Sequence, residues 1–476
     1  MPLAFRIAVV VIICAACVFV FSAAVAGFPD PPGADGYYYL KQIERLAAGD
    51  GYYYKDRSVA FLLPAALAAL SGDSLCAFRL SIAITWALLA VCAGMLAYQA
   101  ASAAGLTGRS RALFGIIPAL TVASSLTVYE LLFEYYKTAV SSLFLIGAAV
   151  LRYSPPISAK IRAMLSTIFV CLALVSHKSA FLFIILYTAV WFLQNRSRKN
   201  ILILAGMGTC SFLAFLIFFE RGWYYLMALP DFFAPPAHWF EWLGYILEND
   251  PAMSLTLGMA LASLISYVRE RRNFPYPLRT LFDTISLSNA LVFVPVFLTG
   301  PAGPTYRLAL LSPLFSAALL LLSTVGSWPS TAAAGILIAL FLFQIVLDHT
   351  RILRHFPGWS ALDQDMMRIT RHVQTGDHLI AHHGLEFYVD YRTGIRARQF
   401  LSSHPQKKSY RLAYIPPGRP GGEARIALEK VMLERLGEKY GLFREDDWTR
   451  IVKRYSIRPH WKNPTDFRSD YIPDYD

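Results

Sequence analysis

The chain has 476 residues, of which 56% are hydrophobic and only 16% are charged, and its mean hydropathy is +0.44. Soluble domains carry about 25% charged residues, so the composition excludes an ordinary soluble protein. The net charge of +12 would suit a nucleic-acid partner in a soluble protein. Here many basic residues stand in short loops between apolar runs, where positive charge fixes membrane orientation, and we expect no nucleic-acid partner.

Apolar runs of membrane-spanning length recur over residues 1–350. They predict a polytopic α-helical membrane protein with about 11 transmembrane helices. The first run, near residues 7–28, is interpreted as an uncleaved helix rather than a signal peptide. Alternation then places the basic loops, such as 105–111 and 195–199, in the cytoplasm with the N-terminus. We expect a multi-pass protein of the bacterial inner (plasma) membrane.

Two domains are predicted. Residues 1–350 form the transmembrane domain, with interfacial helices in the first outer loop, residues 28–76. Residues 351–476 form a small α/β domain on the extracytoplasmic (periplasmic) side, because the number of spans is odd. Its elements are predicted from short periodic segments and glycine stops: strands at 377–381 and 411–415, a helix at 384–391 closed by Gly394, a helix at 423–439 capped by Gly441, and a poorly ordered tail from 458.

The first outer loop places an acidic residue, Asp35, one residue before a run of tyrosines. Residues 39–46 have the spacing of a helix lying at the membrane surface, with Lys41, Glu44 and Arg45 on its polar face. Gly49 and Gly51 end it. Residues 61–70 are apolar but too short to span, so they predict a re-entrant or surface helix, or an extension of the next span.

Polar residues gather at the predicted outer ends of helices. A charged group within or beside a span is costly unless it is paired or functional. Lys178 and Arg307 can neutralise a lipid phosphate, and Asp35 can act as a general base on an acceptor hydroxyl. Asp30 and Asp56 are second choices for that base. The whole set comprises Asp35, Glu130, Glu134, Lys137, His177, Lys178 and Arg307.

The order of these features resembles the GT-C superfamily of integral membrane glycosyltransferases. The resemblance rests on an acidic residue before an aromatic interfacial helix, here Asp35-Gly36-Tyr37-Tyr38-Tyr39, then on Leu62-Leu63-Pro64 and on Arg79-Leu80 entering the second span. Looser matches are Glu130, Glu134 and Lys137 after the third span, the polar corner His177-Lys178, and Tyr306-Arg307 near a late span.

The resemblance implies an inverting hexosyl- or pentosyltransferase that takes its sugar from a polyprenyl-phosphate donor. Asp35 would be the base. The donor phosphate would be bound by Lys178, Arg307, His177 and Lys137, and the substrate pocket would contain Tyr37, Tyr38, Glu130, Glu134 and Tyr306. Besides membrane lipids, the partners would be the donor lipid and a glycan, lipid or protein acceptor. No Trp-Trp-Asp-x-Gly motif occurs, and Asp35 is followed by Gly36 rather than an acidic residue, so the acceptor stays open.

Other readings remain. A surface-polysaccharide polymerase or ligase would place its critical loop later, around 223–249, and a lipid-linked-sugar transporter or flippase would carry polar residues deep in the bilayer. No cofactor is certain, although a divalent cation held by Asp35 and Glu130 is left open. His382, His383 and Glu386 are interpreted as a structural turn, because a third ligand at metal-site spacing is lacking.

Overall fold

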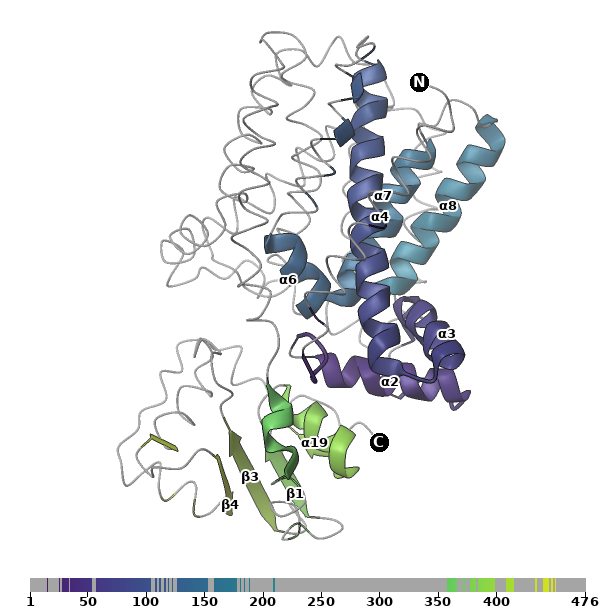
Figure 1. Ribbon diagram of the computed structural model, residues 1–476. Coiled ribbons are helices and arrows are strands. Elements are labelled where there is room, and N and C mark those ends of the chain that lie inside the picture. Colours follow the sequence, from purple (N-terminus) through teal and green to yellow (C-terminus); the bar gives the residue numbers. More distant parts are fainter. Residues whose placement is uncertain are drawn as a thin grey trace. The chain divides into compact units, whose positions relative to one another are not determined.

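The computed structural model describes residues 28–33, 35–53, 57–103, 126–152, 158–177, 358–364, 377–381, 384–398, 408–414 and 440–444, together with single positions between them (Figure 1). Contacts divide the chain into two compact units. The first unit comprises Met1–Val25, Lys55–Pro64 and Arg79–Arg351, and the second comprises Ala26–Tyr54, Ala65–Phe78 and Ile352–Asp476. The first part of the predicted outer loop therefore groups with the C-terminal segment, which the sequence did not indicate.

Helices α6 (Leu126–Glu134), α7 (Tyr136–Arg152) and α8 (Ala159–Ser176) belong to the first unit, as does helix α4 (Ser74–Ala103) from Arg79 onward. Among the described residues, two segments are long and apolar enough to cross a membrane: Ser74–Gln99 and Ala159–Ser176. The spans predicted at 77–100, 138–151 and 164–175 lie within α4, α7 and α8. The predicted later spans lie outside the described residues, so the total of about 11 spans stays a prediction.

Helices α7 and α8 pack closely because one of them carries a glycine at the contact. A Cβ on Gly147 would lie 2.9 Å from two ring atoms of Phe169, so any larger residue there would push the helices apart. The Phe169 ring also meets Phe144 edge to face, with centroids 5.7 Å apart. Ser141 Oγ donates to the Ala173 carbonyl at 3.0 Å, which binds the two helices near the end where α8 stops.

The short helix α3 (Leu62–Ser71) follows the 3-10 turn η1 (Val59–Phe61). Gly72, with φ of +73°, separates α3 from α4, because a left-handed residue ends a helix. The prediction that residues 61–70 extend the next span is therefore wrong, and a separate helix forms. Its side chains are almost all apolar even where exposed, since Leu62 is 51% and Leu70 86% exposed, which favours the surface or re-entrant interpretation.

In the second unit, helix α2 (Gly36–Ala48) is the element predicted at 39–46, and it begins earlier than predicted. Gly49, with φ of +83°, closes it as expected, and its N–H bonds the carbonyls of the last turn. Leu40 and Ile43 are buried as the apolar face predicts. The first turn is buried on all sides, so α2 is more enclosed than a helix lying on a membrane surface.

The C-terminal part of this unit contains a four-stranded sheet in the order β2-β1-β3-β4. Strand β1 (His378–Ala381) pairs in parallel with β2 (Ala397–Arg398) and β3 (Ser409–Tyr414), and β3 pairs antiparallel with β4 (Tyr440–Arg444). Helix α19 (Leu385–Thr393) joins β1 to β2 and ends at Gly394, which has φ of +70°. The predicted strands, the first helix and its glycine cap are thus confirmed.

One prediction about this domain is wrong. Gly441 was expected to cap the helix at 423–439, but it lies in β4 opposite Ala413 of β3. The reason is packing, because a Cβ on Gly441 would lie 2.5 Å from the Phe443 ring, so glycine is needed for that side chain rather than for a helix end. Of the expected helix, Leu433 and Glu434 are described and helical, and the rest lies outside the described residues.

Candidate functional site

Asp35 lies inside a short loop that closes on itself before α2. Gly36 N–H donates to the Gly33 carbonyl at 3.2 Å, and Gly33 has φ of +82°. A Cβ on Gly36 would lie 2.9 Å from Cβ and Cγ of Pro31, so the loop needs a glycine directly after Asp35. This close approach is the physical reason why Asp35 is followed by Gly36 and not by a second acidic residue.

Asp35 occupies the N-cap position of α2, but its side chain makes no capping hydrogen bond. An N-cap aspartate usually accepts such a bond from the second or third helical N–H. Its backbone carbonyl accepts from Tyr39 N–H at 3.0 Å, so the helix fixes the main chain of Asp35 through the backbone alone. The residue is partly exposed. Capping therefore does not explain why an aspartate stands here.

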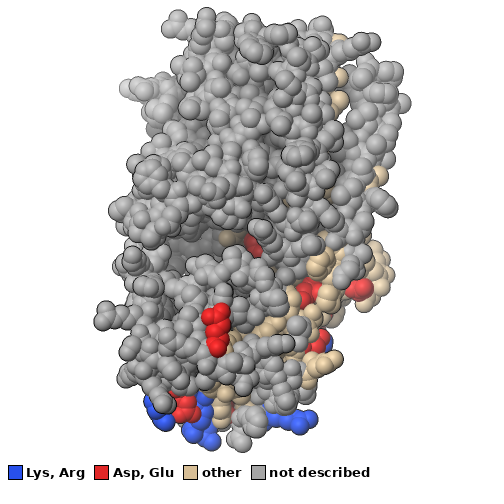
Figure 2. Space-filling view, turned by 60° about the vertical axis from the view of Figure 1, so that its left-hand side comes forward, with Lys and Arg blue, Asp and Glu red and all other residues tan. Residues whose placement is uncertain are grey.

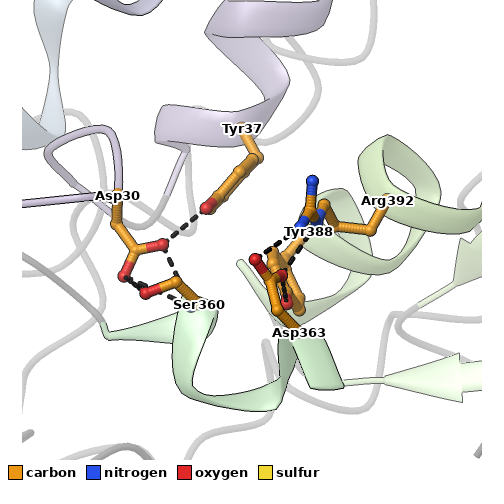
Figure 3. Close-up of polar contacts among 6 residues, drawn as sticks. All are labelled: Asp30, Tyr37, Ser360, Asp363, Tyr388 and Arg392. Carbon is orange, nitrogen blue, oxygen red and sulfur yellow. Dashed lines mark hydrogen bonds and ion pairs between the residues drawn. The ribbon is translucent and has the colours of Figure 1, made fainter. Parts of the chain in front are cut away.

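Asp30 closes the other side of the loop (Figure 3). Its carboxylate accepts from Tyr37 Oη at 2.5 Å and from the Ser360 N–H and Oγ at 3.0 and 3.1 Å. Asp30 is 2% exposed. Burial raises the pKa of this carboxyl, and the hydrogen bonds from Tyr37 and Ser360 oppose that rise. Because both oxygens are engaged and shielded from solvent, Asp30 is a structural anchor and a poorer candidate for the base than Asp35.

A second set of contacts joins α2 to α19. Lys41 Nζ lies 2.7 Å from Asp390 Oδ1, and the ammonium sits 4.3 Å from the centroid of the Tyr53 ring. The Tyr53 hydroxyl donates to the other oxygen of Asp390. Gln42, fully buried, accepts from Tyr53 N–H at 2.9 Å and donates to Tyr38 Oη at 3.1 Å. At Lys41 the polar face of α2 therefore contacts protein. The sequence predicted that this face lies at the membrane surface.

The predicted pocket residues Tyr37 and Tyr38 are buried in the contact between α2 and α19. The Tyr37 ring lies 5.0 Å from that of Tyr388 and 5.1 Å from that of Tyr391, measured between centroids. The Tyr38 ring lies 5.2 Å from that of Phe387. Both tyrosines are less than 10% exposed, so in this structure they pack the loop against α19, and their role in a substrate pocket stays a prediction.

Two tyrosine hydrogen bonds and one ion pair also hold α19 in place. Tyr391 Oη donates to Glu44 Oε1 of α2 at 2.7 Å. Asp363 accepts from Tyr388 Oη, and the Arg392 guanidinium binds the same carboxylate through two nitrogens (Figure 3). On the face drawn in Figure 2, basic side chains of the described residues lie next to acidic ones. The charges of Glu44, Asp363 and Arg392 thus serve contacts within the protein.

Three tyrosines of this cluster predict a dependence of stability on alkaline pH. Burial, followed by nearby carboxylates, raises the pKa of Tyr37, Tyr388 and Tyr391 above the ordinary value of 10.0. Their contribution to stability is full below pH 10.0 and is lost as pH rises above it, because the unfolded chain then releases protons that the folded chain retains. The melting temperature of the full chain should fall above that pH.

The control is the Tyr37→Phe/Tyr391→Phe variant, whose melting temperature should fall less steeply between about pH 9 and about pH 11. An equal slope in the variant and in the unsubstituted chain would contradict this assignment.

In the first unit, three predicted phosphate-binding or pocket residues lie at one corner. Glu134 ends α6 and Lys137 lies in the first turn of α7. His177 follows the last residue of α8 in an extended conformation, as the polar corner predicted. Thr138 Oγ1 lies 3.2 Å from His177 Nδ1, which brings the end of α8 beside the start of α7. Glu134 and Lys137 are partly exposed, and His177 is buried.

Ser58 fastens the outer loop to this corner. Its Oγ donates to the Ser176 carbonyl at 2.7 Å and accepts from Ala60 N–H at 3.2 Å. The loop segment around η1 is thereby fixed to the residue that precedes His177. The predicted site residues that the structure describes therefore form two sets. Asp35, Tyr37 and Tyr38 lie in the second unit, and Glu134, Lys137 and His177 lie in the first.

The remaining predicted residues are not tested. Lys178, Tyr306 and Arg307 lie outside the described residues, and Glu130 is described only as a helical position of α6. Among the described side chains, no group of three or more His, Cys, Asp or Glu could hold a metal ion. A cation held by Asp35 and Glu130 stays a prediction, because the Glu130 side chain is not among them.

Sequence reasoning missed Ser360 and Asp390, and it did not connect Asp30 or Lys41 with the C-terminal domain. Each partner lies more than 300 positions away, since Lys41 and Asp390 are separated by 349 residues and Asp30 and Ser360 by 330. No local pattern reports a pair so distant. The one usable signal for these contacts was the set of polar residues at helical spacing on α2. Such residues need hydrogen-bond or ion-pair partners wherever the helix is buried against protein.

Comparison with known proteins adds little. No family model matches the chain, and none of the curated proteins matches it. Among solved structures, the chain is similar to a mutant of arabinofuranosyltransferase AftD from Mycobacteria, with 18% identity and a TM-score of 0.45 over 78% of this chain. The match covers 30% of that protein's chain. At this TM-score the likeness carries no argument about function.

Proposed function

We propose that this protein is an integral membrane glycosyltransferase. It moves a sugar from a polyprenyl-phosphate donor to an acceptor hydroxyl on the extracytoplasmic face of the membrane. The observation that carries the proposal is the placement of Asp35, a partly exposed residue at the start of α2 whose carboxylate is not used for capping. The loop around it is closed on both sides by Asp30–Tyr37 and Pro31–Gly36 contacts.

In the proposed reaction, the Asp35 carboxylate takes the proton of the acceptor hydroxyl. The acceptor oxygen forms a bond to the anomeric carbon, and the bond from that carbon to the phosphate oxygen breaks with inversion. Polyprenyl phosphate leaves with the electron pair. A loop that holds the base in one position lowers the barrier, because reacting groups that are already oriented need no further ordering.

Cationic side chains would stabilise the leaving phosphate. Lys137 and His177 lie at the corner between α7 and α8, and Lys178 follows His177 in the sequence. Lysine binds phosphate as a point charge, whereas Arg307 could engage two of its oxygens.

The test is donor turnover by the full chain reconstituted in liposomes. Polyprenyl-phosphate-linked hexoses and pentoses are supplied with mixed glycan, lipid and peptide acceptors, and released polyprenyl phosphate is measured by mass spectrometry. The proposal predicts release that depends on the acceptor and equals the amount of glycosylated product. Movement of intact donor across the bilayer without release would favour a flippase, and lengthening of a lipid-linked glycan would favour a polymerase. Either result contradicts the proposal.

A further inference from the structure

The loop that carries Asp35 packs against α19 through Tyr37, and hydrogen bonds also anchor it to one turn of the C-terminal domain. The 3-10 turn η5 (Trp359–Leu362) presents Ser360, whose N–H and Oγ both bond the Asp30 carboxylate. Asp30 in turn accepts from Tyr37, seven residues later, so the carboxylate joins both ends of the loop to η5 (Figure 3). A shift of η5 must therefore shift the loop.

The turn η5 is itself fixed to the sheet. Trp359 is fully buried, and its ring centroid lies 5.9 Å from that of Tyr414, the last residue of β3. Gly358, with φ of +69°, starts the turn, and its carbonyl accepts from Tyr414 Oη at 3.4 Å. A continuous series of contacts thus runs from the sheet through Tyr414, Trp359 and Ser360 to Asp30. Each of these contacts is buried or hydrogen-bonded.

The position of this anchor on the sheet is informative. From β1 the chain passes through α19 to β2 on one side, and β3 lies on the other side of β1. The order of the parallel strands therefore reverses between β1 and β3. In open α/β sheets, the crevice at the carboxyl ends of strands beside such a reversal is where ligands bind. Here Trp359 packs at the carboxyl end of β3, and its neighbour Ser360 holds the chain's own loop.

We propose that the C-terminal domain uses its ligand-binding edge to position the Asp35 loop, with Ser360 as the positioning residue. This inference rests on the proposed function, because positioning matters only if Asp35 acts on a substrate. It assigns the domain a role in placing the base. Residues 30–37 then occupy the place that a soluble ligand would occupy in other domains of this architecture.

The test combines hydrogen exchange with kinetics in the full chain. The variants are Ser360→Ala, Tyr37→Phe and the double variant. Each single substitution removes one side-chain hydrogen bond to Asp30, and the bond from the Ser360 N–H stays in all three. Amide exchange in peptides covering residues 28–40 should rise. The kcat of the double variant should fall about tenfold, because a small displacement of a catalytic group slows the reaction, while the KM for the donor should change less than about twofold.

Two controls separate positioning from a general loss of structure. Ser360→Thr keeps both donors and should restore kcat and exchange close to the unsubstituted values. Ser409→Ala, at the start of β3, should change neither. A merely structural role of Ser360 would lower the amount of folded enzyme without splitting kcat from KM.

The outcomes distinguish the two proposals. Unchanged exchange in residues 28–40 overturns the anchoring by Ser360, whether or not the protein is active. Raised exchange with unchanged kcat overturns the role of that anchoring in catalysis. If the unsubstituted chain turns over no donor, the proposed function fails and the positioning role fails with it, while exchange still reports whether Ser360 holds the loop.

Discussion

Replacing Asp35 with asparagine should lower the rate of sugar transfer by about 100- to 10,000-fold, the range that general acid–base catalysis contributes. The amide has nearly the shape of the carboxylate, but it cannot take a proton from the acceptor hydroxyl. Because the side chain makes no capping bond to α2, the helix should form normally in the variant. The rate is measured as polyprenyl phosphate released per enzyme in proteoliposomes.

The matched control is Asp50→Asn. Asp50 lies in the same outer loop and is exposed, and the contact to Arg45 uses its backbone carbonyl rather than its carboxylate. This variant should retain the activity of the unsubstituted protein. Full activity in Asp35→Asn, at equal expression and equal melting temperature, would rule out Asp35 as the base.

Removing the ammonium of Lys41 should have the largest effect on stability. In Lys41→Met, the Asp390 carboxylate stays where it is, with a side chain only 7% exposed. A buried charge that loses its partner destabilises the fold by about 3–5 kcal/mol. Because the Lys41 side chain is itself 22% exposed, we expect about 2 kcal/mol here, measured by thermal unfolding of the full chain.

A double-variant cycle gives this prediction its control. Lys41→Met/Asp390→Asn should be more stable than Lys41→Met alone, because the second substitution removes the unpaired charge. Lys408→Met, at an exposed position just before β3, should leave the melting temperature unchanged. A double variant less stable than Lys41→Met would show that the pair does not act through its charges.

Local features were predictable where the signal lies within a few residues. The ends of α2 and α19 follow from Gly49 and Gly394, and the polar corner at His177 follows from the break between two apolar runs. These elements depend on helix periodicity and on glycine in left-handed conformations, which a sequence shows directly.

The second unit was not predictable for the opposite reason. Its contacts join residues near the N-terminus to residues after 352, and they consist of buried polar pairs such as Lys41–Asp390 and Asp30–Ser360. A polar residue on a helix looks the same in the sequence whether it faces solvent or a distant partner. The prediction that Gly441 caps a helix failed for a related reason. The Phe443 side chain requires a glycine at this position, and in the sequence that glycine resembles a helix cap.

The central claim is that Asp35 is the base in a sugar transfer from a polyprenyl-phosphate donor. A structure of the full chain with such a donor bound tests it most directly, through the distance from the Asp35 carboxylate to the anomeric carbon. The base lies about 3 Å from the acceptor oxygen and that oxygen about 3.5 Å from the carbon, so we predict at most about 7 Å. A donor seated with its anomeric carbon more than about 10 Å from Asp35 would contradict the account, because no single hydroxyl could then reach both.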